Sequence, residues 1–260
     1  MATARLGFLI DPSRCIGCRS CQVACKEWNR LPADQTVNAG SYENPRDLTN
    51  SLYNRIRFLE KDDGKGGVTW SFVNERCLHC GDAGCMKVCP SPGALYRTKD
   101  GIVGFNQEKC ISCLYCVSAC PFNVPRYDAE KKVTKCHLCL DRVQAGIEPA
   151  CSKACPTGTL QFGSRDALIA RAKASGKKLY GETELEGLGV LYALRESPEA
   201  YGLPADPRIP ASIFLWKDVI KPLGILGFWG SVAAVLLHYV TFGPRKLEEE
   251  EGGKGGGAHG

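Results

Sequence analysis

The longest apolar segment of the chain lies near its C-terminus. Residues Pro222 to Phe242, 21 in all, include no Asp, Glu, Lys or Arg, which matches the roughly 20 residues that a helix needs to cross a bilayer. A buried core helix is the alternative, and the length of the segment argues against it. We therefore expect one transmembrane helix, with an anchor over residues 213–244 and a disordered Glu- and Gly-rich tail over residues 245–260.

Ahead of the anchor, short apolar runs alternate with polar turns. Ala94–Thr98 and Ile102–Phe105 flank Lys99–Gly101, and Asp-Gly between two such runs is a hairpin signal. The stretch from Glu27 to Arg76 is interpreted as an insertion, with a second hairpin predicted across Asp62–Gly67. The pattern predicts small, loop-rich modules.

Part of this plan occurs twice. Gly7–Cys15 and Ile102–Cys110 each give an apolar strand, a polar turn and then the first cysteine of a C-x2-C-x2-C-x3-C run, which indicates internal duplication. Farther along, Ser164 is expected to cap a helix that runs to about Ser175 and stops at Gly176. Residues 164–212 are therefore interpreted as a helix and a connector.

The number and spacing of the cysteines are the most informative feature of the composition. Sixteen of the 260 residues are cysteines, in four groups of four: Cys15, Cys18, Cys21 and Cys25; Cys77, Cys80, Cys85 and Cys89; Cys110, Cys113, Cys116 and Cys120; and Cys136, Cys139, Cys151 and Cys155. So many thiols in one chain need either a disulfide framework or metal. Their spacing decides between the two.

The spacing favours iron–sulfur clusters. A C-x2-C-x2-C loop wraps three thiolates around one face of a [4Fe-4S] cluster, and the fourth cysteine, usually followed by proline, serves a second cluster. Proline follows the fourth cysteine in three groups, at Pro90, Pro121 and Pro156, whereas Lys26 follows Cys25. Zinc sites are usually built from separated C-x2-C pairs, and disulfide scaffolds are typical of short secreted domains. We therefore predict four [4Fe-4S] clusters and no catalytic residue.

Two histidines lie close to cysteines in the sequence and could be considered as cluster ligands. His79 and His137 lie inside C-x2-C loops and could be ligands of the Rieske type. Each group already has four cysteines, so both histidines are expected to pack beside clusters or to bond sulfur. The net charge of +5 is mild, and part of it can balance anionic clusters. No DNA-binding motif is present, so nucleic acid is not expected as a partner.

The cysteine pattern resembles that of the four-cluster iron–sulfur subunits of molybdopterin oxidoreductases, which are electron wires. Within that group the chain is similar to the beta subunit of membrane-bound formate dehydrogenase. The similar motifs are CIGCRSCQVACKEWN (Cys15 to Asn29), YENPRDL (Tyr42 to Leu48), CLHCGDAGCMKVCPSPGAL (Cys77 to Leu95), CPFNVPRYD (Cys120 to Asp128), KCHLCLDRVQAGIEPACSKACPTG (Lys135 to Gly158), GLPADPRI (Gly202 to Ile209) and WKDVIKPLGILGFWGSVAAVLLHYVTFGP (Trp216 to Pro244). They cover nearly the whole chain.

The resemblance implies an α+β protein with two ferredoxin-like double-[4Fe-4S] modules and one C-terminal transmembrane helix. It also implies a function, in which electrons from a formate-oxidising, molybdopterin-containing catalytic subunit pass through four clusters to a cytochrome b membrane subunit and on to quinone. The same relay in a hydrogenase or sulfur-compound reductase complex is one alternative. A zinc-stabilised membrane adaptor is another.

The ligand sets are predicted from the rule that the fourth cysteine of a run crosses to its partner cluster. The second and third groups resemble one compact ferredoxin, and the outer groups then pair by elimination. The expected sets are Cys15, Cys18, Cys21 and Cys155 for cluster 1; Cys25, Cys136, Cys139 and Cys151 for cluster 2; Cys77, Cys80, Cys85 and Cys120 for cluster 3; and Cys89, Cys110, Cys113 and Cys116 for cluster 4. The four-cluster region of residues 1–163 then consists of module A (1–26 and 127–163), module B (77–126) and the insertion (27–76).

The orientation in the membrane is implied only by the resemblance, because equal numbers of Lys and Arg flank the span: Arg208, Lys217 and Lys221 before it, and Arg245, Lys246 and Lys254 after it. Met1–Pro12 has neither an apolar h-region nor a twin arginine, so no export signal of its own is expected. The resemblance implies the cytoplasmic membrane, a periplasmic cluster region, and a wire whose first-run cluster faces the catalytic subunit and whose third-run cluster faces the membrane. His238, inside the span, either bonds headgroups or a neighbouring helix, or lies near a haem or quinone.

Overall fold

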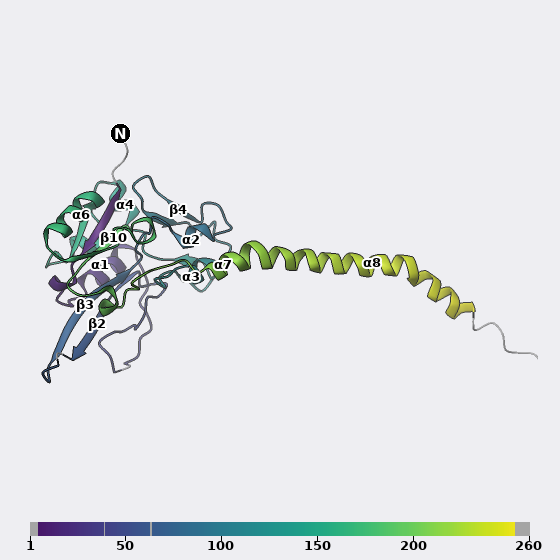
Figure 1. Ribbon diagram of the computed structural model, residues 1–260, viewed down its shortest axis with the longest axis horizontal. Coiled ribbons are helices and arrows are strands. Elements are labelled where there is room, and N and C mark those ends of the chain that lie inside the picture. The colour runs from purple at the N-terminus through teal and green to yellow at the C-terminus, as the bar shows by residue number, and fades with distance from the viewer. Residues whose placement is uncertain (1–4, 39, 63, 253–260) are drawn as a thin grey trace, which may run out of the picture. The chain divides into compact units, whose positions relative to one another are not determined.

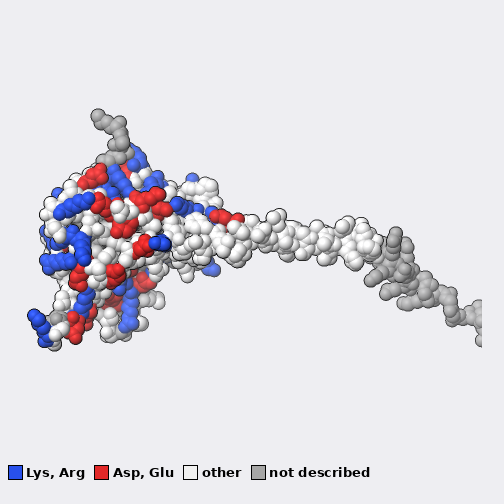
Figure 2. Space-filling model, viewed as in Figure 1, with Lys and Arg blue, Asp and Glu red and all other residues white. Residues whose placement is uncertain are grey.

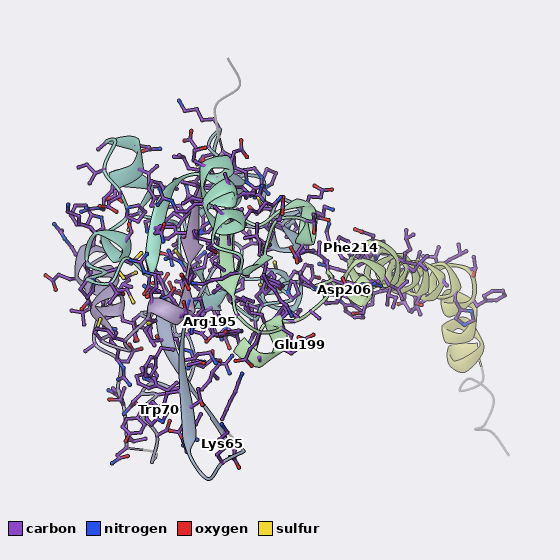
Figure 3. The ribbon with its side chains drawn as sticks, turned by 60° about the vertical axis from the view of Figure 1, so that its left-hand side comes forward. Lys65, Trp70, Arg195, Glu199, Asp206 and Phe214 are labelled. Carbon is purple, nitrogen blue, oxygen red and sulfur yellow. The ribbon has the colours of Figure 1, made fainter. Side chains whose placement is uncertain are left out.

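The computed structural model describes residues 5–38, 40–62 and 64–252 of the chain (Figure 1). It divides into two units, one up to Pro210 and one from Ala211 onwards. The first unit contains all sixteen cysteines, and the sulfur atoms in Figure 3 lie in it. Each unit is described by itself.

A four-stranded sheet organises the first unit. Its strands, in spatial order, are β8 (Leu160–Ser164), β1 (Leu6–Ile10), β10 (Val190–Leu194) and β9 (Lys178–Tyr180). β1 is antiparallel to β8 and parallel to β10, so that Phe8 lies between Phe162 and Val190, and β10 is antiparallel to β9. β1 is therefore a central strand, as its nearly continuous apolar sequence suits.

β1 also separates two parts of the core, because successive side chains of a strand point to opposite faces. Leu9 packs into a small cluster with residues of β10 and of helix α6 (Arg165–Ala174): Leu168, Ala172, Leu191 and Ala193. Phe8 and Ile10 lie in the larger core, which contains several of the cysteines. The strand thus places a helix on one side and cysteine-containing core on the other.

The segment 164–212 contributes more than the helix and connector that we expect from its sequence, because it also supplies β9 and β10. Residues Leu188 to Leu194 are almost completely buried. The partner of β10 is β1, at the other end of the unit. Pairing between segments so far apart in the sequence leaves no local turn signal, so only the folded chain shows that residues 178–194 complete the sheet.

Both predicted hairpins are present. The Asp-Gly turn joins β4 to β5, and the long hairpin of the insertion joins β2 to β3, with Lys65 in its turn and Trp70 on β3 (Figure 3). β6 and β7 form a further antiparallel pair. The bounds of these strands are β2 (Asn54–Asp62), β3 (Val68–Arg76), β4 (Leu95–Arg97), β5 (Val103–Phe105), β6 (Arg126–Tyr127) and β7 (Val133–Thr134).

Short helices surround the cysteine loops: α1 (Ser20–Trp28), α2 (Gly84–Lys87), α3 (Tyr115–Ser118), α4 (Leu140–Gln144) and α5 (Ala150–Lys153), with the 3-10 turns η1 (Pro12–Arg14), η2 (Glu184–Glu186) and η3 (Pro198–Tyr201). α6 matches the predicted helix. It starts after Ser164, whose side chain makes no capping hydrogen bond, and it ends before Gly176, whose φ of 68° is left-handed.

The second unit consists of α7 (Ala211–Leu215), the π-helical turn η4 (Trp216–Ile220) and α8 (Lys221–Gly252). Among the described residues, Ala211–Gly243 is the one helical stretch long and apolar enough to cross a membrane, and its apolar window is not buried in the protein. Figure 2 shows an uncharged surface along most of it. These properties agree with the predicted anchor.

The expected disordered tail differs from what the structure shows. α8 continues past residue 244 to Gly252, so residues 245–252 are helical. The sequence Arg-Lys-Leu-Glu-Glu-Glu-Glu from Arg245 to Glu251 consists of favourable helix formers, which explains why the helix does not stop at the end of the apolar run. The remainder of the predicted tail, residues 253–260, lies outside the described residues.

The contact between α6 and the sheet gives a stability prediction. Leu168→Ala should lower the thermal unfolding midpoint of the purified complex, because removing a buried leucine side chain typically costs about 2–5 kcal/mol and Leu168 is 3% exposed. Cluster absorbance during a temperature ramp measures the effect. Lys173→Ala on the same helix is the control, since its ion pair with Glu182 is at the surface and such pairs contribute little. Equal shifts in both variants would contradict this packing role.

Candidate functional site

The four cysteine loops make the same turn although their sequences differ. The residue two positions after the first cysteine has a left-handed backbone in every loop: Gly17 (φ 69°), His79 (48°), Ser112 (61°) and Leu138 (55°). Turns of this kind direct successive backbone N–H groups toward one side, which makes a concave site for anionic atoms. Gly17 alone of the four adopts the conformation without a Cβ, so packing must hold the other three turns.

The later cysteines of each loop repeat as well. The third cysteine is the second residue of a helix in all four groups: Cys21 in α1, Cys85 in α2, Cys116 in α3 and Cys151 in α5. The fourth cysteine follows the end of α2, α3 and α5, and the proline after it cannot continue a helix. Lys26 takes the place of that proline in the first group, and α1 continues to Trp28. The groups are structural repeats, in agreement with the predicted duplication.

Two of the predicted quartets each line a cavity. Cys110, Cys113 and Cys116 line a cavity together with Cys89 from the preceding group. A second cavity is lined in the same way by Cys15, Cys18, Cys21 and, from the last group, Cys155. In both cavities the fourth cysteine comes from another run, as the crossing rule predicts.

The members of the other two quartets lie close enough to one another to interact electrostatically. Burial raises the pKa of Cys25, and the neighbours that raise it further are Cys136, Cys151 and Cys139. Burial likewise raises the pKa of Cys80, and the neighbours that raise it further are Cys77, Cys120 and Cys85. Metal binding displaces protons from such thiols. Each predicted quartet is therefore assembled in the fold, while the assignment of iron ligands to quartets stays a prediction.

Arg76, at the end of β3, lies against the sulfurs of the second quartet. It is 2% exposed, and its guanidinium donates to Cys136 Sγ at 3.0 Å and to Cys151 Sγ at 3.2 Å. Burial alone would lower the pKa of Arg76, but Cys136 and Cys151 raise it, so the group is charged. A buried guanidinium that faces two cysteine sulfurs fits an anionic thiolate cluster.

Two asparagines provide weaker, neutral donors. Asn74, on the same strand as Arg76, is 3.5 Å from Cys21 Sγ through Nδ2. Asn29 donates to the Cys25 carbonyl at 2.7 Å and is 3.6 Å from Cys25 Sγ. Hydrogen bonds to ligand sulfurs are one of the features that set cluster potentials.

The two histidines lie in cysteine loops, and the structure shows which groups their ring nitrogens contact. The Leu140 N–H donates to His137 Nδ1, and His137 Nε2 donates to Asn29 Oδ1 at 2.8 Å, so protein groups use both ring nitrogens. The Val103 N–H donates to His79 Nδ1 at 3.1 Å, and Nε2 has no hydrogen-bond partner in the part of the protein that the structure describes. Burial lowers the pKa of His79. The ring is therefore neutral, with Nε2–H as a buried donor.

Sequence reasoning missed Arg76, Asn74 and Asn29. A signal for the first two does exist, because Asn74 and Arg76 alternate with Glu75 along β3 and so lie on one face of the strand. Glu75 points the other way and pairs with Arg55 at 2.6 Å. An inward-facing Asn-x-Arg directly before Cys77 is a pattern that a search for polar groups on the buried face of a strand would find.

Comparison with known protein families identifies the kind of domain that contains the cysteines. Two models described as 4Fe-4S dicluster domains match residues 14–94 and 68–165, and together these ranges include all sixteen cysteines. A third model, described as formate dehydrogenase N, transmembrane, matches residues 209–252. That range includes most of the helical second unit.

Curated relatives agree over most of the sequence. The nitrate-inducible formate dehydrogenase iron–sulfur subunit of Escherichia coli (strain K12) is 43% identical over 95% of this chain and 89% of its own length. The formate dehydrogenase 2 subunit beta (cytochrome c-553) of Nitratidesulfovibrio vulgaris is 41% identical over 75% of this chain and 95% of its own. The B subunit of the anaerobic dimethyl sulfoxide reductase of Haemophilus influenzae is 38% identical over 62% of this chain and 75% of its own.

These matches decide several predictions. The chain carries four [4Fe-4S] clusters, two for each dicluster domain, so the zinc alternative is wrong. The prediction of an α+β fold with two dicluster modules and one C-terminal transmembrane helix is confirmed. The transmembrane match and the single apolar helix among the described residues make the chain a single-pass membrane protein.

The shared turn gives a prediction about cluster retention. Gly17→Ala should speed the loss of iron to a chelator, because a side chain at φ 69° is strained by about 1–2 kcal/mol and the new Cβ would lie 3.2 Å from the Phe72 ring. Gly163→Ala is the control, since a Cβ at Gly163 would meet no atom within 4 Å and the φ of this glycine is not positive. The measurement is cluster absorbance over time with a chelator. Equal rates of iron loss in both variants would show that the left-handed turn at Gly17 does not control cluster retention.

Proposed function

Because this protein belongs to the family of formate dehydrogenase iron–sulfur subunits, we propose that it relays electrons from a formate-oxidising, molybdopterin-containing catalytic subunit through its four [4Fe-4S] clusters to a cytochrome b subunit that reduces quinone. Membership of this family implies a catalytic subunit and a membrane partner. The relay itself needs no catalytic residue on this chain, since each bound cluster takes up one electron and passes it on.

The observation that favours formate as the substrate of the complex is the match of residues 209–252 to the formate dehydrogenase N transmembrane family. The cysteine groups alone specify only the broader class, as the similarity to a dimethyl sulfoxide reductase subunit demonstrates. A hydrogenase or sulfur-compound reductase complex would use the same cluster region. The C-terminal unit is therefore the part of the protein that favours formate dehydrogenase.

We propose the following ligand sets, supported by the quartets in the fold: Cys15, Cys18, Cys21 and Cys155 for cluster 1; Cys25, Cys136, Cys139 and Cys151 for cluster 2; Cys77, Cys80, Cys85 and Cys120 for cluster 3; and Cys89, Cys110, Cys113 and Cys116 for cluster 4. The protein groups around these sulfurs hold the clusters and tune them. Backbone N–H groups of the left-handed turns and the Arg76 guanidinium offset negative charge on the sulfurs.

The surface of the second unit is consistent with the proposal of a membrane partner. Its apolar side chains are exposed along the helix, for example Leu226, Trp229, Leu237 and Phe242, and such a surface requires lipid or another apolar helix. His238 is also exposed, with its ring 5.1 Å from that of Phe242. It is available to lipid headgroups or to a neighbouring helix of the cytochrome b subunit.

The proposed order of the wire has cluster 1 at the catalytic subunit and cluster 4 at the membrane subunit. Cys113→Ala in the intact complex should therefore bring formate-driven quinone reduction close to the background rate while formate-driven dye reduction at the catalytic subunit stays unchanged. Anaerobic assays with the two acceptors measure this difference. The cluster 4 signal in electron paramagnetic resonance should be lost or converted to that of a three-iron cluster.

Ser118→Ala is the matched control for this experiment, because Ser118 is exposed on the same helix α3. Dye reduction that does not respond to formate in the wild-type complex would refute the formate assignment. The opposite order would be indicated by two results together. Cys113→Ala would keep quinone reduction, and Cys18→Ala would lose both quinone reduction and the haem-proximal cluster.

We also propose that the cluster region lies on the periplasmic side of the cytoplasmic membrane. Protease added to spheroplasts should then degrade the first unit and leave a short fragment that contains α8. Inverted vesicles, in which the other face is exposed, provide the control. Protection of the cluster region in spheroplasts, combined with cleavage of the segment after α8, would place the cluster region in the cytoplasm instead.

A further inference from the structure

Arg76 is the most deeply buried charged side chain on β3, and its surroundings are unusual for a cation. It is 2% exposed, its guanidinium carbon lies 4.4 Å from the centre of the Phe8 ring, and two of its nitrogens donate to Cys151 Sγ and Cys136 Sγ. The aromatic ring and the two sulfurs hold the planar group in one orientation.

A buried cation needs a nearby negative charge, because removing it from water is costly. Among the described residues no carboxylate forms an ion pair with Arg76, and its sequence neighbour Glu75 pairs with Arg55 at 2.6 Å. The sulfurs of Cys136 and Cys151 are therefore the groups that compensate Arg76. Neutral thiols would do so poorly, whereas thiolates around a [4Fe-4S] core carry negative charge.

Among the hydrogen bonds of the described residues, no other charged side chain donates to a cysteine sulfur. Asn74 and Asn29 are neutral and more distant, at 3.5 and 3.6 Å from their sulfurs. Arg97, which is also close to a cysteine loop, donates to the carbonyl oxygens of Cys80 and Gly81, and Lys135 donates to the carbonyl oxygens of Val103 and Cys136. Cluster 2 thus has a charged donor directly on its ligand sulfurs. Burial raises the pKa of Cys85 and Cys120, and the buried Lys135 opposes that rise through its charge alone.

We propose that Arg76 is a positioning residue for electron transfer that raises the reduction potential of cluster 2 relative to its value without this guanidinium. This inference rests on the proposed ligand sets, in which Cys136 and Cys151 belong to one cluster. Adding one electron increases the negative charge on the sulfurs that Arg76 contacts, and a fixed cation in a low-dielectric interior stabilises that form. No proton moves, since the guanidinium keeps its protons throughout.

The position of Arg76 along the sequence indicates which electron-transfer step depends on the potential of cluster 2. Its covalent neighbour Cys77 is a proposed ligand of cluster 3, whereas its side chain touches the sulfurs of cluster 2. The end of β3 therefore lies at the junction of the two modules. Electrons that pass from one module to the other cross this junction, so the potential of cluster 2 bears directly on that step.

The test is a redox titration of the purified intact complex, followed by electron paramagnetic resonance, for the wild type, Arg76→Gln and Arg76→Lys. Gln keeps an N–H donor but removes the charge. It should lower the midpoint potential of one cluster by an amount equivalent to at least a tenfold loss in reduced-state stabilisation, which is about 59 mV for one electron. Lys keeps the charge without the paired donors, so it should lower the same potential by less.

Arg97→Gln is the matched control, because it removes a partly buried guanidinium that contacts carbonyl oxygens instead of sulfur. It should leave the Arg76-sensitive signal unchanged. Unchanged potentials in both Arg76 variants would overturn the inference. So would variants that keep three clusters but lose cluster 2 whether the charge is retained or not, since Arg76 would then be required only for folding.

The same titration distinguishes failure of this inference from failure of the proposed ligand sets. If Cys136 and Cys151 belonged to different clusters, Arg76→Gln would shift two signals by comparable amounts, instead of one signal far more than any other. That outcome would overturn both the assignment of one cluster to Arg76 and the ligand sets on which it rests. A single shifted signal, with the control unchanged, supports both.

Discussion

The bond between iron and cysteine sulfur is the constraint on which the first unit depends. Four backbone loops have to bring sixteen sulfurs into quartets, and the protein does so by repeating one left-handed turn followed by a helix. Several of these cysteines, such as Cys21, Cys77 and Cys151, are members of the main core. A unit whose strands are mostly two to five residues long outside the insertion hairpin has little other means of fixing its loops, so cluster binding and folding are coupled.

Binding the clusters places negative charge inside the protein. The surrounding residues stabilise this charge with donors of different strength. Left-handed turns offer backbone N–H groups, Asn74 and Asn29 offer neutral amides, and Arg76 offers a full positive charge. His79 adds a buried N–H without a partner among the described residues. Because hydrogen bonds and burial set cluster potentials, four clusters with similar ligands acquire different surroundings, and an electron wire needs such differences.

The sheet connects this chemistry to the rest of the unit. β1 carries Phe8, which lies under Arg76 on one side, and Leu9, which contacts α6 on the other. β8, just after the last cysteine, and β10, from the C-terminal part of the unit, both pair with β1. β1 lies shortly before the first cysteine group and β8 shortly after the last, so their pairing brings these two groups to the same sheet.

Local patterns in the sequence determined the cysteine groups, the iron–sulfur chemistry, both hairpins, α6 and the apolar anchor. Each of these depends on neighbouring residues: a C-x2-C spacing, an Asp-Gly turn, a run of 21 residues without formal charge. Only the tertiary structure decided that β9 and β10 complete the sheet. It also decided that Arg76 donates to Cys136 and Cys151, 60 and 75 residues away. The physical reason is that strand pairing and buried donor contacts are set by the register between distant segments, and spacing along the sequence does not encode that register.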